Sequence, residues 1–356
     1  MNQPGEPTDP TDPTGSTGAT GSTGAGDLAD AADDVLLDEV PALGPLFLRG
    51  VTRAARLAGE RRRGTAPTTL PGVTYAVRGV PVDATRLRDY QALLGLRAAD
   101  RLPAGFVHVM AFPVATALLV RPDFPLPLPG LVHVANRVTQ HRPLFRDDHL
   151  DVRARATNLR PHRSGTQLDV VVEVRRAGSS ELAWHGLSTY LAKGRRLSPT
   201  TAVGGATAVV GAASAQVAAR APPSSGVTEG TGGGAAREEF LAPMPTGAWR
   251  LPADIGRRYG AVSHDRNPIH LTALTARPFG FRRAIAHGMY TAARALADVG
   301  PAAGHTFTWT VDFASPVYLP ATVNVRVAPQ GDGFGYAVWN PSTGKPHLTG
   351  AVNPLP

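Results

Sequence analysis

The chain has 356 residues, of which 42% are hydrophobic, and its formal net charge is +8. This length suits two domains of ordinary size, and the hydrophobic content is enough for a packed core, which excludes a wholly disordered chain. There is no cysteine, which excludes disulfides, iron–sulfur clusters and cysteine-based zinc sites. Basic residues are not interleaved with aromatic ones, so we expect no nucleic-acid partner, and the charge indicates an arginine-rich surface.

The first 64 residues are predicted to lie outside the main fold. Residues 1–27 are rich in Pro, Thr, Gly and Ser and predict a disordered tail. Residues 28–64 carry Leu and Val at helical spacing and predict an N-terminal helical segment, although Pro41 and Pro45 interrupt it. The start of the chain lacks the features of a secretory signal, and the longest apolar run, 110–120, is far shorter than a membrane span of ~20 residues. We therefore expect a cytoplasmic protein without an integral membrane segment.

The remaining chain is predicted to contain two similar repeats. Residues 198–238 are of low complexity and indicate a flexible linker between parts 65–197 and 239–356. Residues 143–153 match 316–326 without a gap, and stretches of alternating polarity, typical of strands, lie on both sides of each match. An Ala-rich helical stretch comes earlier in each part. The predicted fold class is α+β, with each repeat a helix packed on antiparallel strands.

The candidate chemistry lies in residues 259–270, Tyr-Gly-Ala-Val-Ser-His-Asp-Arg-Asn-Pro-Ile-His. Asp265 and His270 are separated by the turn dipeptide Asn267-Pro268, which can bring a carboxylate and an imidazole to the same opening. Gly288 follows at the predicted start of the Ala-rich helix, where a free backbone N–H can polarise a carbonyl oxygen. An acid, a base and a carbonyl polariser suit hydration of a double bond conjugated to a thioester, or the reverse reaction.

The pattern Tyr-x-x-x-Ser-x-Asp-x-Asn-Pro-Ile-His, followed by Phe-Gly-Phe and Ile-Ala-His-Gly-Met, resembles the MaoC-like, (R)-specific enoyl-thioester hydratases and 3-hydroxyacyl-thioester dehydratases. The resemblance implies a double hot-dog fold, in which a central helix of each repeat is wrapped by an antiparallel sheet. It implies that Asp265 and His270 activate water and exchange the α-proton, and that Gly288 supplies the oxyanion N–H. It also implies that no metal or cofactor is needed, since coenzyme A or an acyl carrier protein enters as part of the substrate.

Further residues around the motif are assigned supporting roles. The predicted turn and support residues are Ser263, Asn267 and Pro268, and the candidate pocket residues are His264, Tyr259, Phe279, Phe281 and His287. His264 stands where the family usually has Gly, which puts rate and substrate preference in doubt. Arg282, Arg283 and Arg294 are interpreted as solvated surface rather than phosphate ligands.

The first repeat is predicted to have lost the catalytic pair. Aligning Tyr90 with Tyr259 places Leu96 at the position of Asp265 and Arg101 at that of His270. We therefore expect one active site per chain, with residues 65–197 as a non-catalytic repeat whose Pro122–Pro129 stretch accommodates a longer acyl chain. The chain is expected to act as a monomeric pseudo-dimer or a homodimer. Two alternatives stay open, an acyl-CoA thioesterase and a non-catalytic acyl-thioester-binding module.

Overall fold

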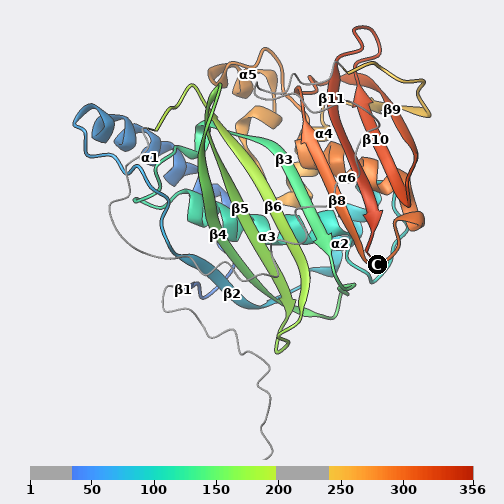
Figure 1. Ribbon diagram of the computed structural model, residues 1–356, viewed down its shortest axis with the longest axis horizontal. Coiled ribbons are helices and arrows are strands. Elements are labelled where there is room, and N and C mark those ends of the chain that lie inside the picture. The colour runs from blue at the N-terminus through green and yellow to red at the C-terminus, as the bar shows by residue number, and fades with distance from the viewer. Residues whose placement is uncertain (1–33, 198–239, 356) are drawn as a thin grey trace, which may run out of the picture.

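A computed structural model describes residues 34–197 and 240–355 (Figure 1). Its centre is one 11-stranded sheet in the order β1-β2-β4-β5-β6-β3-β8-β11-β10-β9-β7. The first-repeat elements are β2 Thr74–Pro81, α2 Ala84–Leu93, α3 Ala104–Leu119, η1 Leu128–Gly130, β3 Leu131–Gln140, β4 His149–His162, β5 Gly165–Arg176 and β6 Leu182–Lys193. The second-repeat elements are β7 Gly247–Leu251, α4 Ile255–Ser263, η2 Pro268–His270, α5 Ala273–Ala276, η3 Arg277–Phe279, α6 Gly288–Val299, η4 Gly300–Ala303, β8 Phe307–Phe313, β9 Ala321–Gln330, β10 Gly333–Trp339 and β11 Pro346–Pro354.

The two repeats share one continuous sheet. Strand β3 of the first pairs antiparallel with β8 of the second, from Ala135 opposite Asp312 to Gln140 opposite Phe307. Figure 1 shows the long helices α3 and α6 behind the sheet, on the same face. The predicted α+β fold with two helix-and-sheet repeats is thus confirmed, and the architecture is a double hot-dog. The expected linker, residues 198–238, and the expected tail, residues 1–27, lie outside the described residues.

The central helix of the first repeat is largely apolar on every side. All its residues except Phe112 are buried, and its single side-chain hydroxyl, that of Thr116, donates to the Phe112 carbonyl oxygen at 2.8 Å. A helix that is apolar all round must be enclosed, and α3 packs against β2, β4, β5 and β6. By contrast, α6 is amphipathic, and its buried face contacts β9 and β10.

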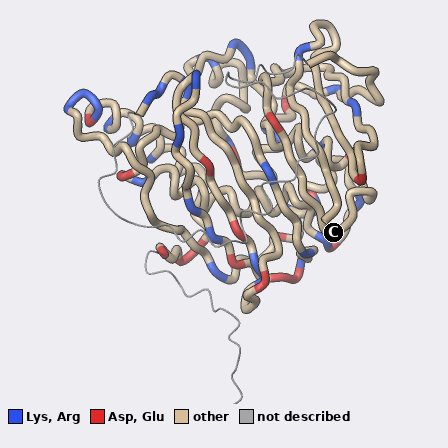
Figure 2. The backbone as a smooth tube through the Cα atoms, viewed as in Figure 1, with Lys and Arg blue, Asp and Glu red and all other residues tan. Residues whose placement is uncertain are grey.

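The N-terminal segment contributes one strand and one helix. Strand β1, Asp34–Leu36, pairs parallel with β2, and α1, Leu43–Arg62, follows. The two prolines do not break α1, because Pro41 precedes it and Pro45 lies in its first turn, where the missing N–H has no intrahelical acceptor. Figure 2 shows that Lys and Arg residues are spread along the backbone of both repeats and gather at the end of α1. Within the described ranges, no helix is long and apolar enough to cross a membrane.

Candidate active site

The turn that carries Asp265 is built by the end of α4. His264, the residue after the helix, adopts a left-handed backbone with φ 59° and ψ 2°, the conformation that Gly takes at many helix ends. The Asp265 N–H then donates to Ser263 Oγ at 3.2 Å, and Asp265 Oδ1 accepts the N–H of Asn267 at 3.1 Å. The expected support residues Ser263 and Asn267 therefore lie where they hold the carboxylate, and His264 preserves the turn.

Two glycines let this turn lie directly on α4. A Cβ at Gly256 would lie 2.0 Å from the carbonyl oxygen of His270, and one at Gly260 would lie 2.9 Å from the carbonyl oxygen of Asp265. These two glycines are one helical turn apart and thus share a face of α4. They fix the backbones of both candidate catalytic residues, a role that sequence reasoning missed and that the four-residue glycine spacing in a short polar helix could have indicated.

His270 is held in one tautomer. The imidazole is buried, and its Nδ1 lies 2.8 Å from the carbonyl oxygen of Ile285. A carbonyl oxygen only accepts, so Nδ1 carries the proton, and in the neutral ring Nε2 keeps a lone pair. Burial, reinforced by the neighbouring His287, lowers the pKa of His270 to about 3. His270 is therefore neutral at pH 7 and its Nε2 can accept a proton.

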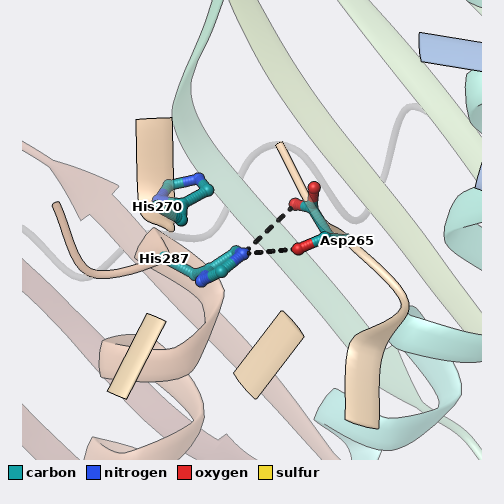
Figure 3. Close-up of side chains that lie close together, drawn as sticks. All are labelled: Asp265, His270 and His287. Carbon is teal, nitrogen blue, oxygen red and sulfur yellow. Dashed lines mark hydrogen bonds and ion pairs between the residues drawn. The ribbon is translucent and has the colours of Figure 1, made fainter. Parts of the chain in front are cut away.

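A third residue, His287, completes the cluster (Figure 3). Its Nε2–H donates to the Asp265 carbonyl oxygen at 3.0 Å and lies 3.7 Å from Asp265 Oδ2. Its ring stacks on that of His270 with a centroid separation of 3.6 Å. Burial lowers the pKa of His287 to about 4. The sequence predicts only a pocket position for His287, whereas the structure shows it in contact with both members of the pair.

The pKa of the Asp265 carboxyl group is shifted in the opposite direction to the pKa values of the two histidines. Burial raises the pKa of Asp265, and the nearby His270 and the Asn267 N–H partly offset that rise. A carboxyl whose pKa is raised and an imidazole whose pKa is lowered exchange a proton more readily than ordinary groups would.

Asp265, His270 and His287 could also be considered as a metal site. Each offers one donor atom, and the three atoms lie within 4.8 Å of one another. Binding through His287 Nε2 would require loss of the hydrogen bond that this nitrogen donates to Asp265. The donor set therefore fits a metal poorly in this arrangement, and the expectation of a site that needs no metal stays a prediction.

Gly288 begins α6, as predicted, and its N–H has no acceptor within the helix. The space beside its Cα, however, is occupied by protein. A Cβ at this position would lie 2.9 Å from Cε1 of Phe313 and 3.2 Å from two other ring carbons. Close packing of the Phe313 ring therefore favours glycine here, in addition to any need for access by a substrate oxygen.

Asp265, His270, His287 and Gly288 line one cavity of about 1810 Å³. The cavity continues from the second repeat into the first, where its wall includes His108 of α3, His133 of β3 and Tyr190 of β6. Its far end is lined by apolar side chains of α1, α3 and η1, namely Phe47, Leu48, Val51, Phe112, Leu119 and Leu128. One largely apolar cavity thus extends from the candidate catalytic cluster of the second repeat into the first repeat and to α1.

Most of the expected pocket residues line this cavity, since Tyr259, Phe279, Phe281 and His287 all do so. The prediction for His264 is wrong, because its side chain is exposed and does not line the cavity. Of the stretch Pro122–Pro129, Leu128 and Pro129 line the cavity, whereas Phe124 and Leu126 are buried in the core. The surface interpretation is wrong for Arg294, which is half-buried and whose guanidinium lies 4.9 Å from the Trp249 ring centroid.

The alignment of the repeats holds at Leu96 but is wrong at Arg101. Gly95 has φ 71° after α2, as His264 has a positive φ after α4, so Leu96 does take the position of Asp265. Arg101, however, forms a β-bridge with Phe145, and its counterpart in the second repeat is the bridge between Ile285 and Tyr318. Arg101 therefore corresponds to Ile285. The first repeat connects its helices by a much shorter segment and has no position for His270 at all.

Comparison with known proteins identifies the family. Residues 239–346 match the MaoC like domain. The chain is 34% identical over 312 residues to 3-hydroxyacyl-thioester dehydratase X of Mycobacterium tuberculosis, an alignment that covers 87% of this chain and 99% of that protein. The crystal structure of HtdX from M. tuberculosis superposes with a TM-score of 0.63 at 32% identity, covering 79% of this chain and 100% of that one. A MaoC-like dehydratase from Phytophthora capsici, 15% identical, shares the fold with a TM-score of 0.56 and covers 81% of this chain and 97% of its own. The chain belongs to the MaoC-like dehydratase family.

Proposed function

We propose that the protein is an (R)-specific 3-hydroxyacyl-thioester dehydratase, which also catalyses the reverse hydration of 2-enoyl thioesters. The observation that carries this proposal is the convergence of Asp265, His270 and the Gly288 N–H on one cavity. The similarity to 3-hydroxyacyl-thioester dehydratase X over nearly its whole length supports it.

Asp265 and His270 suit a reaction in which one proton is removed from water and another is added to C2 of the substrate. In the hydration direction, His270 Nε2 accepts a proton from water as the water oxygen bonds to C3. The Asp265 carboxyl gives its proton to C2, and the Gly288 N–H stabilises the negative charge that develops on the thioester oxygen. The carbon–carbon double bond becomes single, and the proton returns from His270 to Asp265 before the next turnover. Dehydration is the reverse sequence.

In this proposal the first repeat lines the cavity but contributes no catalytic group. Leu96 offers no ionisable group at the position of Asp265, and the segment that would carry a second His270 is missing. The apolar side chains of α1, α3 and η1 at the far end of the cavity instead suit an acyl chain. We propose that residues 65–197, together with α1, bind the acyl chain and that each chain has one active site.

The test is an assay for hydration of a 2-enoyl-CoA, which is monitored through the loss of absorbance of the conjugated thioester. Replacing Asp265 with Asn keeps the size and the hydrogen bond accepted from Asn267 but removes the titratable proton, so we expect kcat to fall by a factor of about 10²–10⁴. A folded Asp265→Asn protein with full activity would contradict the assigned roles. Release of free thiol without loss of the double bond would instead indicate a thioesterase, and binding without either reaction would indicate a non-catalytic module.

A further inference from the structure

A second, smaller cavity of about 320 Å³ adjoins the catalytic one. The two cavities share Pro316, Val317 and His347 in their walls. The wall of the smaller one also contains Arg282, Arg283 and the loop around Asn340. It therefore adjoins the part of the catalytic cavity that is formed by the second repeat.

Two guanidinium groups and an aromatic ring form the distinctive wall of this small cavity. The guanidinium carbons of Arg282 and Arg283 lie 5.1 and 5.8 Å from the centroid of the Tyr318 ring. Both arginines are exposed, and within residues 34–197 and 240–355 neither forms an ion pair or a side-chain hydrogen bond. Other arginines, such as Arg121 and Arg153, are paired with carboxylates. Two unneutralised guanidinium groups held at one ring are suited to phosphate oxygens, which they can bind in bidentate fashion.

The position of this wall relative to the catalytic cluster is fixed by the backbone. Ile285, two residues after Arg283, accepts the hydrogen bond from His270 Nδ1 and forms the bridge with Tyr318. The pair of arginines and the candidate base are therefore attached to the same short segment. A ligand that spans from the candidate catalytic cluster to the arginines would contact residues that Ile285 links directly.

The other end of the catalytic cavity is mainly apolar, because it is lined by side chains of α1, α3 and η1. Of the Arg and Lys residues in the cavity wall, Arg160 is neutralised by Asp169 at 2.8 Å, whereas Arg163 and Lys193 are exposed. With an acyl chain at this end, the part of the substrate beyond the sulfur has a route past Pro316, Val317 and His347, the residues that the two cavities share. The small cavity on the other side of these residues contains the Arg282–Arg283 pair.

Resting on the proposed function, we propose that the small cavity binds the adenosine phosphate portion of coenzyme A, with Arg282 and Arg283 on the phosphates and Tyr318 beside the base. The protein would then act on coenzyme A thioesters. A carrier protein, whose prosthetic arm bears no adenosine, would leave this cavity unused.

The test compares two thioesters of the same enoyl group, one of coenzyme A and one of N-acetylcysteamine, which lacks the nucleotide. In the double variant Arg282→Ala/Arg283→Ala we expect kcat/KM for the coenzyme A thioester to fall about 10- to 100-fold, mainly through KM, with the short thioester unaffected. The matched control is Arg62→Ala/Arg63→Ala, which removes two adjacent exposed arginines at the end of α1 and the same net charge. We expect this control to behave like the unchanged protein with both thioesters.

A binding measurement separates this proposal from the dehydratase assignment. Adenosine 3′,5′-bisphosphate, titrated by calorimetry, should bind the unchanged protein and the Arg62/Arg63 control and should bind the Arg282/Arg283 variant at least about 10-fold more weakly. This readout needs no catalysis, so it holds even if no hydration is found. Equal binding to all three proteins would overturn the proposal, as would an equal loss of kcat/KM with both thioesters.

Discussion

Replacing Gly288 with Ala tests whether this glycine serves the packing of Phe313 or the approach of a substrate oxygen. The new Cβ would lie 2.9 Å from Phe313 Cε1, whereas carbon atoms in favourable contact are about 3.5–4.0 Å apart. The ring must therefore move by roughly 0.6–1 Å. Overpacking of this kind costs about 1–3 kcal/mol, partly offset by up to about 1 kcal/mol of helix propensity. We expect a net loss of about 0–3 kcal/mol in the free energy of unfolding.

The effect on catalysis is expected to be larger than the effect on stability. In the proposed mechanism the Gly288 N–H points at a developing oxyanion, and displacement of such a donor costs about 10²-fold in kcat. The decisive comparison is a double-mutant cycle with Phe313→Leu, measured by urea unfolding and by hydration of an enoyl-CoA. If packing is the cause, Phe313→Leu removes most of the penalty of Gly288→Ala in both assays. If the loss of kcat is the same in both backgrounds while stability is restored, the Cβ obstructs the substrate itself and the packing explanation is refuted.

Two further predictions concern the residues around the catalytic pair. Burial holds the pKa of His287 at about 4 against about 6.5 in an unfolded chain, so the unfolded state binds more protons as the pH falls from 6.5 towards 4, and the folded state is destabilised there. At pH 5 the destabilisation caused by His287 amounts to about 2 kcal/mol. The loss of unfolding free energy between pH 7.5 and 5 should therefore be smaller by that amount in His287→Gln than in the unchanged protein. Equal losses in the two proteins would contradict a buried neutral His287. Gly256→Ala places a Cβ 2.0 Å from the His270 carbonyl oxygen, so we expect about 3 kcal/mol of destabilisation and a displaced imidazole with much reduced activity. The control, Ala261→Gly on the exposed side of α4, should cost about 1 kcal/mol without changing kcat. A fully active and stable Gly256→Ala protein would show that the turn is not held by this contact.

Local patterns in the chain are sufficient to predict the repeat, the α+β class and the catalytic candidates. Alternating polarity and the match between 143–153 and 316–326 are patterns of neighbouring residues, and each strand they predicted is present in the shared sheet. Asp265 and His270 were predictable because the Asn267-Pro268 turn between them is also local. Its geometry follows from the backbone preferences of two adjacent residues, and the structure shows the two side chains facing one cavity.

Contacts between residues far apart in the chain emerge only from the tertiary structure. His287 joins the cluster because Ile285 brings η2 and the start of α6 together. The carbonyl oxygen of Ile285 accepts a hydrogen bond from His270, and the Ile285 backbone forms a β-bridge with Tyr318. The same bridge, compared with that of Arg101 and Phe145, shows that the first repeat lacks the segment which carries His270, a gap that an ungapped alignment cannot reveal. The need for glycine at 256 and 288 likewise appears only once the carbonyl oxygen of His270 and the ring of Phe313 are in place. A local pattern specifies which elements form, but only packing specifies which side chains meet, because those contacts depend on the register and placement of elements that are distant in the chain.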